Sequence, residues 1–204
     1  KCLFASAVGF PVLYIVKDGL YGAKVKEEIS ALTDEKAVYL PAKDDVLLYK
    51  TAFDRNSLFN RLEALYDIKR GARFVVTTFQ ALLQLFPKDI PVVRIEKGML
   101  YVIDEICARL TAFGYRREEF AEDRATYAVR GDILEINPVN GDYSFRVDFF
   151  GDEVESIFRF VREDRENKIA VTNFEVIPAT DALFDNEELP KIKNKLSLSL
   201  AKFG

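Results

Sequence analysis

The sequence predicts two consecutive folding units: a parallel α/β layer, and then an α+β unit in which one helix packs on an antiparallel sheet. Short apolar runs alternate with helical patterns as far as about residue 86. The pattern changes at Pro87–Pro91, and after Gly114 only strand-like runs separated by turn residues follow. The expected division is therefore 1–91 for the first unit and 92–180 for the second, with 181–204 belonging to whatever comes next.

In the first unit, strands and helices are expected to alternate, which implies parallel strands joined by right-handed crossovers. The expected elements are a strand at 11–16, a helix ending at Thr33-Asp34, a strand at 37–40, a helix at 56–69, a strand at 73–77 and a short helix at 79–86. The helix at 56–69 shows one apolar stripe at helical spacing and is followed by Gly71 as a stop. Thr78 is a suitable N-cap for the short helix.

The second unit is expected to hold one helix and several strands. The predicted elements are a strand at 92–96, a helix at 100–113 closed by Gly114, and strands at 126–130, 132–137, 143–150, 153–161 and 169–177. Glycine-containing turns separate most of these strands, as expected for an antiparallel sheet.

Composition excludes several classes of function. The chain has 204 residues, no histidine and two cysteines, so neither a histidine-based catalytic triad nor a histidine metal site can form within it. The net charge is −4, and residues 93–178 carry 12 basic and 18 acidic residues, which makes that region poor at attracting nucleic acid. The apolar stretch 4–16 is interrupted and too short to span a membrane. We expect a cytoplasmic location, no membrane contact, and a chain that is part of a longer protein.

Phosphate-binding and acidic motifs are weak. The nearest approach to a P-loop is Gly19–Val25, whose glycine spacing is wrong and whose Lys24 follows no glycine, so a turn that starts a helix is the better interpretation. Asp104-Glu105 falls on the polar face of a helical stripe, and the acids at 118–123 lie in a polar connector. No catalytic residue, metal ligand or cofactor-binding residue is therefore expected in this chain.

The strand at 143–150 carries the most informative pattern. Alternation places Tyr143, Phe145, Val147 and Phe149 on a core face, and Ser144, Arg146, Asp148 and Phe150 on the opposite, polar face. An exposed aromatic near an arginine is typical of an interaction hot spot. The alternative is that Phe150 sits at a bulge and turns back into the core. For Arg130, at the end of another strand, the alternative is a surface ion pair with Asp132 or Asp148.

The same stretches resemble a known module. The runs 114–120, 127–138, 145–157 and 176–179, which include RGDILEI-x-P and RVDFFGDEVESI, are similar to the second domain shared by the bacterial excinuclease protein UvrB and the transcription-repair coupling factor (Mfd). Asn137 stands where that family more usually has Phe, so a local packing change is expected there.

The first unit also resembles this family. Residues 11–32 and 56–85 are similar to the family's divided, helicase-like first domain, and 183–204 would begin its returning half. The lack of a P-loop, and a connector at 41–54 too short for the DNA-engaging hairpin of UvrB, favour the coupling-factor branch. In that branch the resemblance implies that this first domain is a degenerate copy.

The resemblance implies a docking function. The second domain of the family binds the damage-sensing ATPase UvrA, and the motifs match docking residues to Arg130, Arg146 and Phe150. It also implies RNA polymerase and DNA as partners, and ATP as a cofactor, of other parts of the parent protein. Two alternatives stay open: a UvrB-like excinuclease ATPase that contacts DNA, and a module whose docking face is masked by the parent protein's own C-terminal domains.

Overall fold

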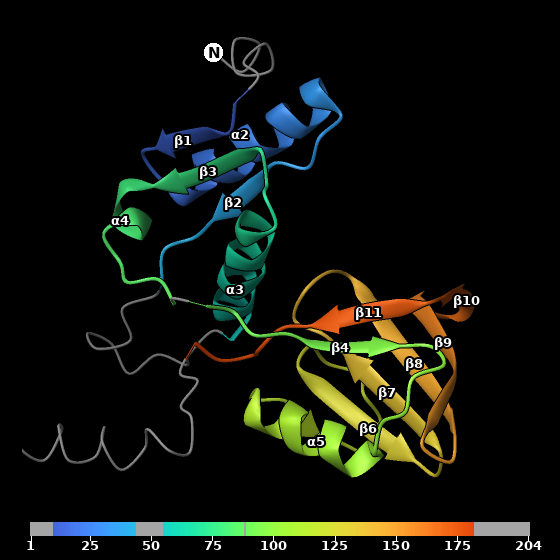
Figure 1. The fold of residues 1–204 in the computed structure, drawn as a ribbon. Helices are drawn as coiled ribbons and strands as arrows, with labels where there is room; N and C mark the ends of the chain where they lie inside the picture. The colour runs from blue at the N-terminus through green and yellow to red at the C-terminus, as the bar shows by residue number, and fades with distance from the viewer. Residues whose placement is uncertain (1–9, 44–54, 88, 182–204) are drawn as a thin grey trace, which may run out of the picture.

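The computed structural model describes residues 10–43, 55–87 and 89–181. Most of the connector at 41–54, and all of the expected third segment except Asp181, lie outside the described residues. The described chain has a mixed architecture with a small sheet in its first part and a larger sheet in its second part (Figure 1).

The first part contains the parallel layer that the alternation predicts. Its elements are β1 (Val12–Val16), α2 (Gly19–Thr33), β2 (Val38–Leu40), α3 (Arg55–Lys69), β3 (Phe74–Thr78) and α4 (Phe79–Leu82). The strand order is β1-β3-β2, and both pairings are parallel. The predicted positions are confirmed, except that α4 ends at Leu82 instead of Phe86.

The P-loop-like fragment is the start of a helix. Asp18 is the N-cap of α2, and its carboxylate accepts a hydrogen bond of 2.8 Å from the backbone N–H of Tyr21. Gly22 faces the ring of Tyr39 so closely that a Cβ at this position would overlap the ring. Gly22 therefore serves the packing of α2 on β2.

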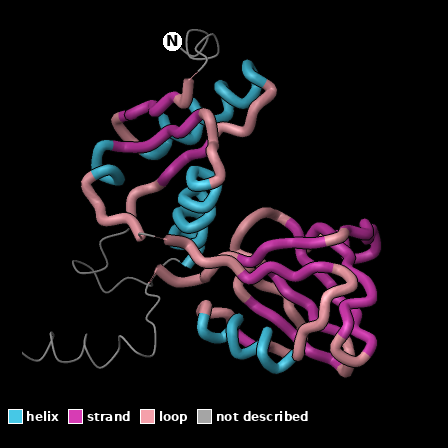
Figure 2. The backbone as a smooth tube through the Cα atoms, in the orientation of Figure 1, coloured by secondary structure: helices cyan, strands magenta, loops and turns pink. Residues whose placement is uncertain are grey.

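The second part contains one helix and two sheets. Its elements are β4 (Val93–Glu96), α5 (Ile103–Ala112), β5 (Arg116–Arg117), β6 (Thr126–Arg130), β7 (Ile133–Asn137), β8 (Tyr143–Phe150), β9 (Glu153–Val161), β10 (Asp164–Val171) and β11 (Asn173–Val176). The larger sheet has the order β10-β9-β8-β7-β6-β5, and all its pairings are antiparallel except the one between β5 and β6. β4 and β11 form a separate antiparallel pair. Figure 2 shows α5 as the helix among the strands and loops of this part.

Two predictions for this part are wrong. The run 169–177 is not one strand, because it divides at Thr172 between β10 of the larger sheet and β11 of the smaller one. The helix begins at Ile103 rather than Leu100. Residues 98–101 instead run beside the β8–β9 turn, where the N–H of Tyr101 donates to the carbonyl of Asp152 at 2.7 Å.

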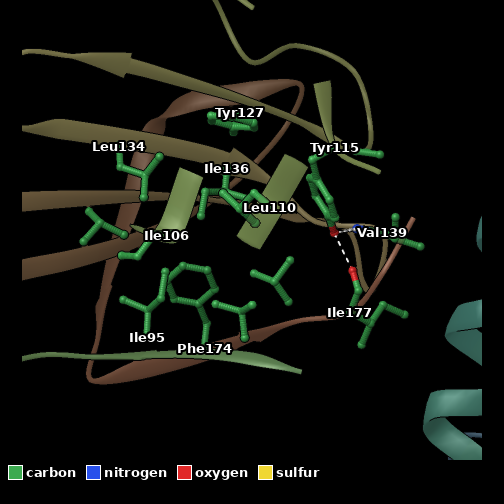
Figure 3. Close-up of a cluster of buried hydrophobic side chains, with 14 of the residues drawn as sticks. Ile95, Ile106, Leu110, Tyr115, Tyr127, Leu134, Ile136, Val139, Phe174 and Ile177 are labelled. Carbon is green, nitrogen blue, oxygen red and sulfur yellow. Dashed lines mark hydrogen bonds between the residues drawn. The ribbon is translucent and has the colours of Figure 1, made fainter. Parts of the chain in front are cut away.

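The core of the second part lies between the inner face of the larger sheet and a layer made by α5 and the β4–β11 pair (Figure 3). Ile106 and Leu110 of α5 face Leu134 and Ile136 of β7, all of them buried. Tyr115 is buried at one end of this core. Its hydroxyl donates to the carbonyl of Ile177 at 2.9 Å and accepts from the N–H of Val139 at 3.0 Å. Burial raises the pKa of this phenol well above its usual value.

Helix α3 contacts both parts. Ala64 packs against β2, whereas Phe59 and Leu62 belong to the core of the second part. Polar contacts reinforce the second attachment: Arg124 donates to Glu63 at 3.1 Å, and Arg70 pairs with Glu175 at 2.7 Å. The hydroxyl of Tyr66 also donates to Glu175, and burial together with that carboxylate raises its pKa to about 12.

Candidate protein-docking surface

The larger sheet has a second face that neither α5 nor the β4–β11 pair covers. We call this the outer face and define it by residues of β6, β7 and β8 whose side chains point away from the core: Arg130, Glu135, Arg146, Asp148 and Phe150. The strand register brings them together, because Arg146 is the cross-strand partner of Glu135, and Ile133 is the partner of both Arg130 and Asp148. Side chains of directly paired residues lie on the same side of a sheet.

Strand β8 confirms most of the alternation seen in the sequence. Val147 and Phe149 are buried in the core, and Phe145 packs against it with its ring stacked on Phe174 at 4.1 Å. Phe150 is 80% exposed, so the alternative in which it turns back into the core is wrong. Tyr143 differs from the prediction: it is exposed at the start of the strand.

Glu135 is the centre of the ion pairs on this face. Its carboxylate is nearly inaccessible to solvent, with 8% of the side chain exposed, and one oxygen, Oε2, lies 2.8 Å from Arg130 and 2.9 Å from Arg165. The predicted alternative partners of Arg130, Asp132 and Asp148, are therefore incorrect. The register explains the difference, because Glu135 pairs with Ala128, two residues before Arg130 and on the same face. The guanidinium of Arg130 also lies over the ring of Phe120, 5.0 Å from its centre.

Arg146 is held by its own strand. Its Nε donates to Oδ1 of Asp148 at 2.8 Å, and the other carboxylate oxygen of Asp148 accepts from the hydroxyl of Ser156 at 3.0 Å. Within the described ranges, the two terminal nitrogens of Arg146 have no hydrogen-bond partner. The guanidinium is thus oriented by one contact and keeps the donor pair that binds a carboxylate in a bidentate manner.

Leu100 extends the outer face at a position that the sequence pattern did not predict. The residue forms an isolated antiparallel bridge with Glu153, which is also the cross-strand partner of Phe150. The side chains of Leu100, Glu153 and Phe150 therefore form one row on one side of the sheet. Leu100 is 73% exposed. Leu100 fits the helical spacing of the apolar residues that follow it, so the pattern assigned it to the helix. The Lys97-Gly98 turn just before it indicates that the chain can be extended at this point.

The outer face combines charged and apolar groups in a way that suits binding to another protein. It offers oriented guanidinium groups beside two exposed apolar side chains, a combination common at interaction hot spots. In the part of the chain that the structure describes, no group of three or more acidic or cysteine side chains could hold a metal ion. No helix among the described residues is long and apolar enough to cross a membrane.

Residues 93–181, which carry the whole outer face, match the family model of the UvrB interaction domain. This segment is therefore similar to the UvrB interaction domain family. Nearly the whole chain is similar to larger proteins that bear one of two names.

The chain is 30% identical over 171 residues to the transcription-repair-coupling factor of Myxococcus xanthus, covering 80% of this chain and 14% of that protein. It is 24% identical over 200 residues to that of Bacillus subtilis, covering 93% and 17%. With the UvrABC system protein B of Fervidobacterium nodosum it shares 24% identity over 213 residues, covering 95% of this chain and 32% of the relative. The chain thus spans a small fraction of the length of these relatives.

Proposed function

We propose that this chain is the UvrA-docking part of a transcription-repair-coupling factor, and that the outer face is the docking surface. The outer face supports this proposal, because Arg130 and Arg146 flank the buried carboxylate of Glu135, and Phe150 projects into solvent. The segment that carries this face matches the UvrB interaction domain family. In this proposal the two arginines pair with carboxylates of UvrA, and Phe150 enters an apolar pocket.

The role in the whole protein follows from this docking step. UvrA would be recruited to stalled RNA polymerase, while polymerase contacts, DNA translocation and ATP hydrolysis would belong to other parts of the parent protein in the cytoplasm. The chain itself would be non-catalytic and bind no cofactor. The first part of the chain would be a degenerate helicase-like domain that carries the docking module through α3.

Surface plasmon resonance with immobilised UvrA tests the proposal. We expect the wild-type chain to bind, and Arg146→Ala and Phe150→Ala to weaken binding about thirtyfold or more, which corresponds to about 2 kcal/mol at a hot spot. Two matched controls lie away from the outer face. Phe79 in α4 is 64% exposed, and Arg94 in β4 pairs with Glu96 at 2.5 Å as Arg146 does with Asp148.

Phe79→Ala and Arg94→Ala should bind like the wild type. Circular dichroism must show that all four variants are folded. Absence of binding by the folded wild-type chain, or equal losses in the control variants, would contradict the proposal.

The similarity to UvrABC system protein B supports a second candidate: part of a UvrB-like excinuclease ATPase. The two candidates differ in the sequence that precedes Lys1. An intact G-x-x-x-x-G-K-[ST] motif there, with ATP binding by the extended chain, would favour the second candidate. In the first candidate the parent protein's C-terminal domains could mask the outer face, and stronger UvrA binding by this chain than by the full protein would support such masking.

A further inference from the structure

Strand β10, at the edge of the larger sheet, departs from regular pairing with β9. On β10, residues 165–168 separate Asp164 from Ile169, whereas Phe160 alone separates the partners of these two residues on β9. The extra residues on β10 interrupt the ladder, and an irregularity of this kind re-aims the side chains that it carries.

Two of these side chains, Arg165 and Lys168, lie over the ring of Phe160. The guanidinium carbon is 5.5 Å and the ammonium nitrogen 5.8 Å from the ring centre. Phe160 is the cross-strand partner of Ser144, which lies two residues before Arg146, so the ring is on the outer side of the sheet. We call Arg165 and Lys168 the β10 pair. The β10 pair therefore extends the outer face to the edge of the sheet.

Both cations of the β10 pair are accessible and keep free donors. The side chain of Arg165 is 38% exposed, and Nη2 donates to Oε2 of Glu135 at 2.9 Å. This is its one hydrogen bond to the described residues. Lys168 is exposed and forms neither a hydrogen bond nor an ion pair with any described residue. An acceptor from another molecule can therefore reach both groups.

This end of the outer face carries an excess of positive charge. Glu135 is shared between Arg130 and Arg165, and Lys168 has no acidic partner among the described residues, so three cations stand against one carboxylate. The acids of the same strand do not compensate. Neither Asp164 nor Glu166 forms an ion pair with the β10 pair in the described part of the chain.

The free groups define an acidic ligand. The β10 pair offers donors and positive charge but no acceptor, which suits the carboxylate of aspartate or glutamate. A nucleic acid would need an extended basic track for its many phosphates, and residues 93–178 carry a net charge of −6. The chemistry therefore favours an acidic stretch of a protein.

We propose that the β10 pair is a subsite for acidic side chains of UvrA, beside the arginine and phenylalanine anchors. The inference rests on the proposed docking function and adds to it a second point of charge recognition. Arg165 is already held by Glu135 and by the ring of Phe160, so binding costs it little side-chain freedom. Lys168 supplies a further positive charge at the rim of the interface.

Surface plasmon resonance with immobilised UvrA tests the subsite. We expect Lys168→Gln to weaken binding about threefold and Lys168→Glu about tenfold, mainly through slower association, as is usual for a charge at the rim of an interface. Lys168→Arg keeps the charge and should retain binding. Arg165→Gln is a second, independent variant with an expected loss of about tenfold. Circular dichroism confirms that each variant is folded.

Lys24→Glu is the matched control, because it changes the net charge as Lys168→Glu does but alters an exposed lysine of α2 in the first part of the chain. It should bind UvrA like the wild type. Added salt should weaken wild-type binding more than that of Lys168→Gln, because a screened charge contact is already missing in the variant. A purely structural contact with Phe160 would leave this salt dependence unchanged.

Two outcomes contradict the subsite while docking stands. In the first, Lys168→Glu and Arg165→Gln bind UvrA as tightly as Lys24→Glu does, while Phe150→Ala does not; the β10 pair then only covers Phe160. In the second, Lys168→Glu abolishes binding of a labelled single-stranded oligonucleotide and leaves UvrA binding unchanged, so the ligand is a nucleic acid.

Other outcomes separate the subsite from the docking function. If the β10 variants lose UvrA binding while Arg146→Ala and Phe150→Ala keep it, the subsite stands and the proposed anchors fail. If the folded wild-type chain does not bind UvrA at all, the docking function fails and the subsite fails with it.

Discussion

Removing the carboxylate of Glu135 should destabilise the fold, even though Glu135 lies on the outer face and not in the apolar core. Glu135→Ala deletes an ion pair with Arg130 at 2.8 Å and a charge-assisted hydrogen bond from Arg165 at 2.9 Å. A hydrogen bond to a charged group contributes about 1.5–3 kcal/mol. The arginine side chains are 39% and 38% exposed, so water compensates for part of the loss. We therefore expect the free energy of unfolding to fall by about 2 kcal/mol, and the Tm by about 4–8 °C.

Urea unfolding followed by circular dichroism measures this change. Glu155→Ala is the matched control, because Glu155 is an exposed acid on the neighbouring strand β9, and its loss should change stability by less than about 0.5 kcal/mol. Glu135→Gln keeps one acceptor oxygen and should give an intermediate loss. If Glu135→Ala is as stable as the control, the two contacts contribute little, and Glu135 does not organise the arginines of the outer face.

Three further predictions concern other parts of the molecule. Leu100→Ala should weaken UvrA binding by about tenfold in surface plasmon resonance without changing the Tm, because Leu100 is exposed in the row with Phe150. An unchanged affinity would show that Leu100 does not contact UvrA. Tyr115→Phe deletes two buried hydrogen bonds and should lower stability by about 2 kcal/mol. Burial raises the pKa of Tyr115 in the folded state, so the stabilisation that its neutral phenol gives the fold is fully present below pH 10.0 and declines as the pH rises further. The free energy of unfolding of the wild type should therefore fall more steeply above pH 10.0 than that of Tyr115→Phe. Gly22→Ala should cost about 1–3 kcal/mol by forcing Tyr39 aside, and a Tm equal to the wild type would show that the ring has room to move.

The elements that depend on local pattern were predictable from the sequence. The helix α3 shows a clear apolar stripe, and β8 and β9 carry alternating or β-branched residues between glycine turns, so their positions agree closely with the structure. The prediction of one strand at 169–177 is wrong because it also rested on local composition alone. Both β10 and β11 have strand-like residues, and only the pairing partners, which are distant in the sequence, show that the chain changes sheets at Thr172.

The candidate site was predictable in part. Alternation placed Arg146 and Phe150 on one exposed face because the period of a strand is fixed. The partner of Arg130 depends on the register between β6 and β7, which places Glu135 beside it and leaves Asp132 in the turn. A lone acid within the apolar run Ile133–Ile136 was the available signal for a buried ion pair.

Photocrosslinking to UvrA tests the docking claim most directly. A photoreactive phenylalanine analogue is incorporated at position 150, on the outer face, and in a separate sample at position 79, which is exposed but lies on the first part of the chain. We expect a covalent adduct with UvrA from position 150 and none from position 79, and loss of that adduct in the presence of excess unmodified chain. A specific adduct from position 79 alone, or none from position 150 under conditions where the chain binds UvrA, would contradict it.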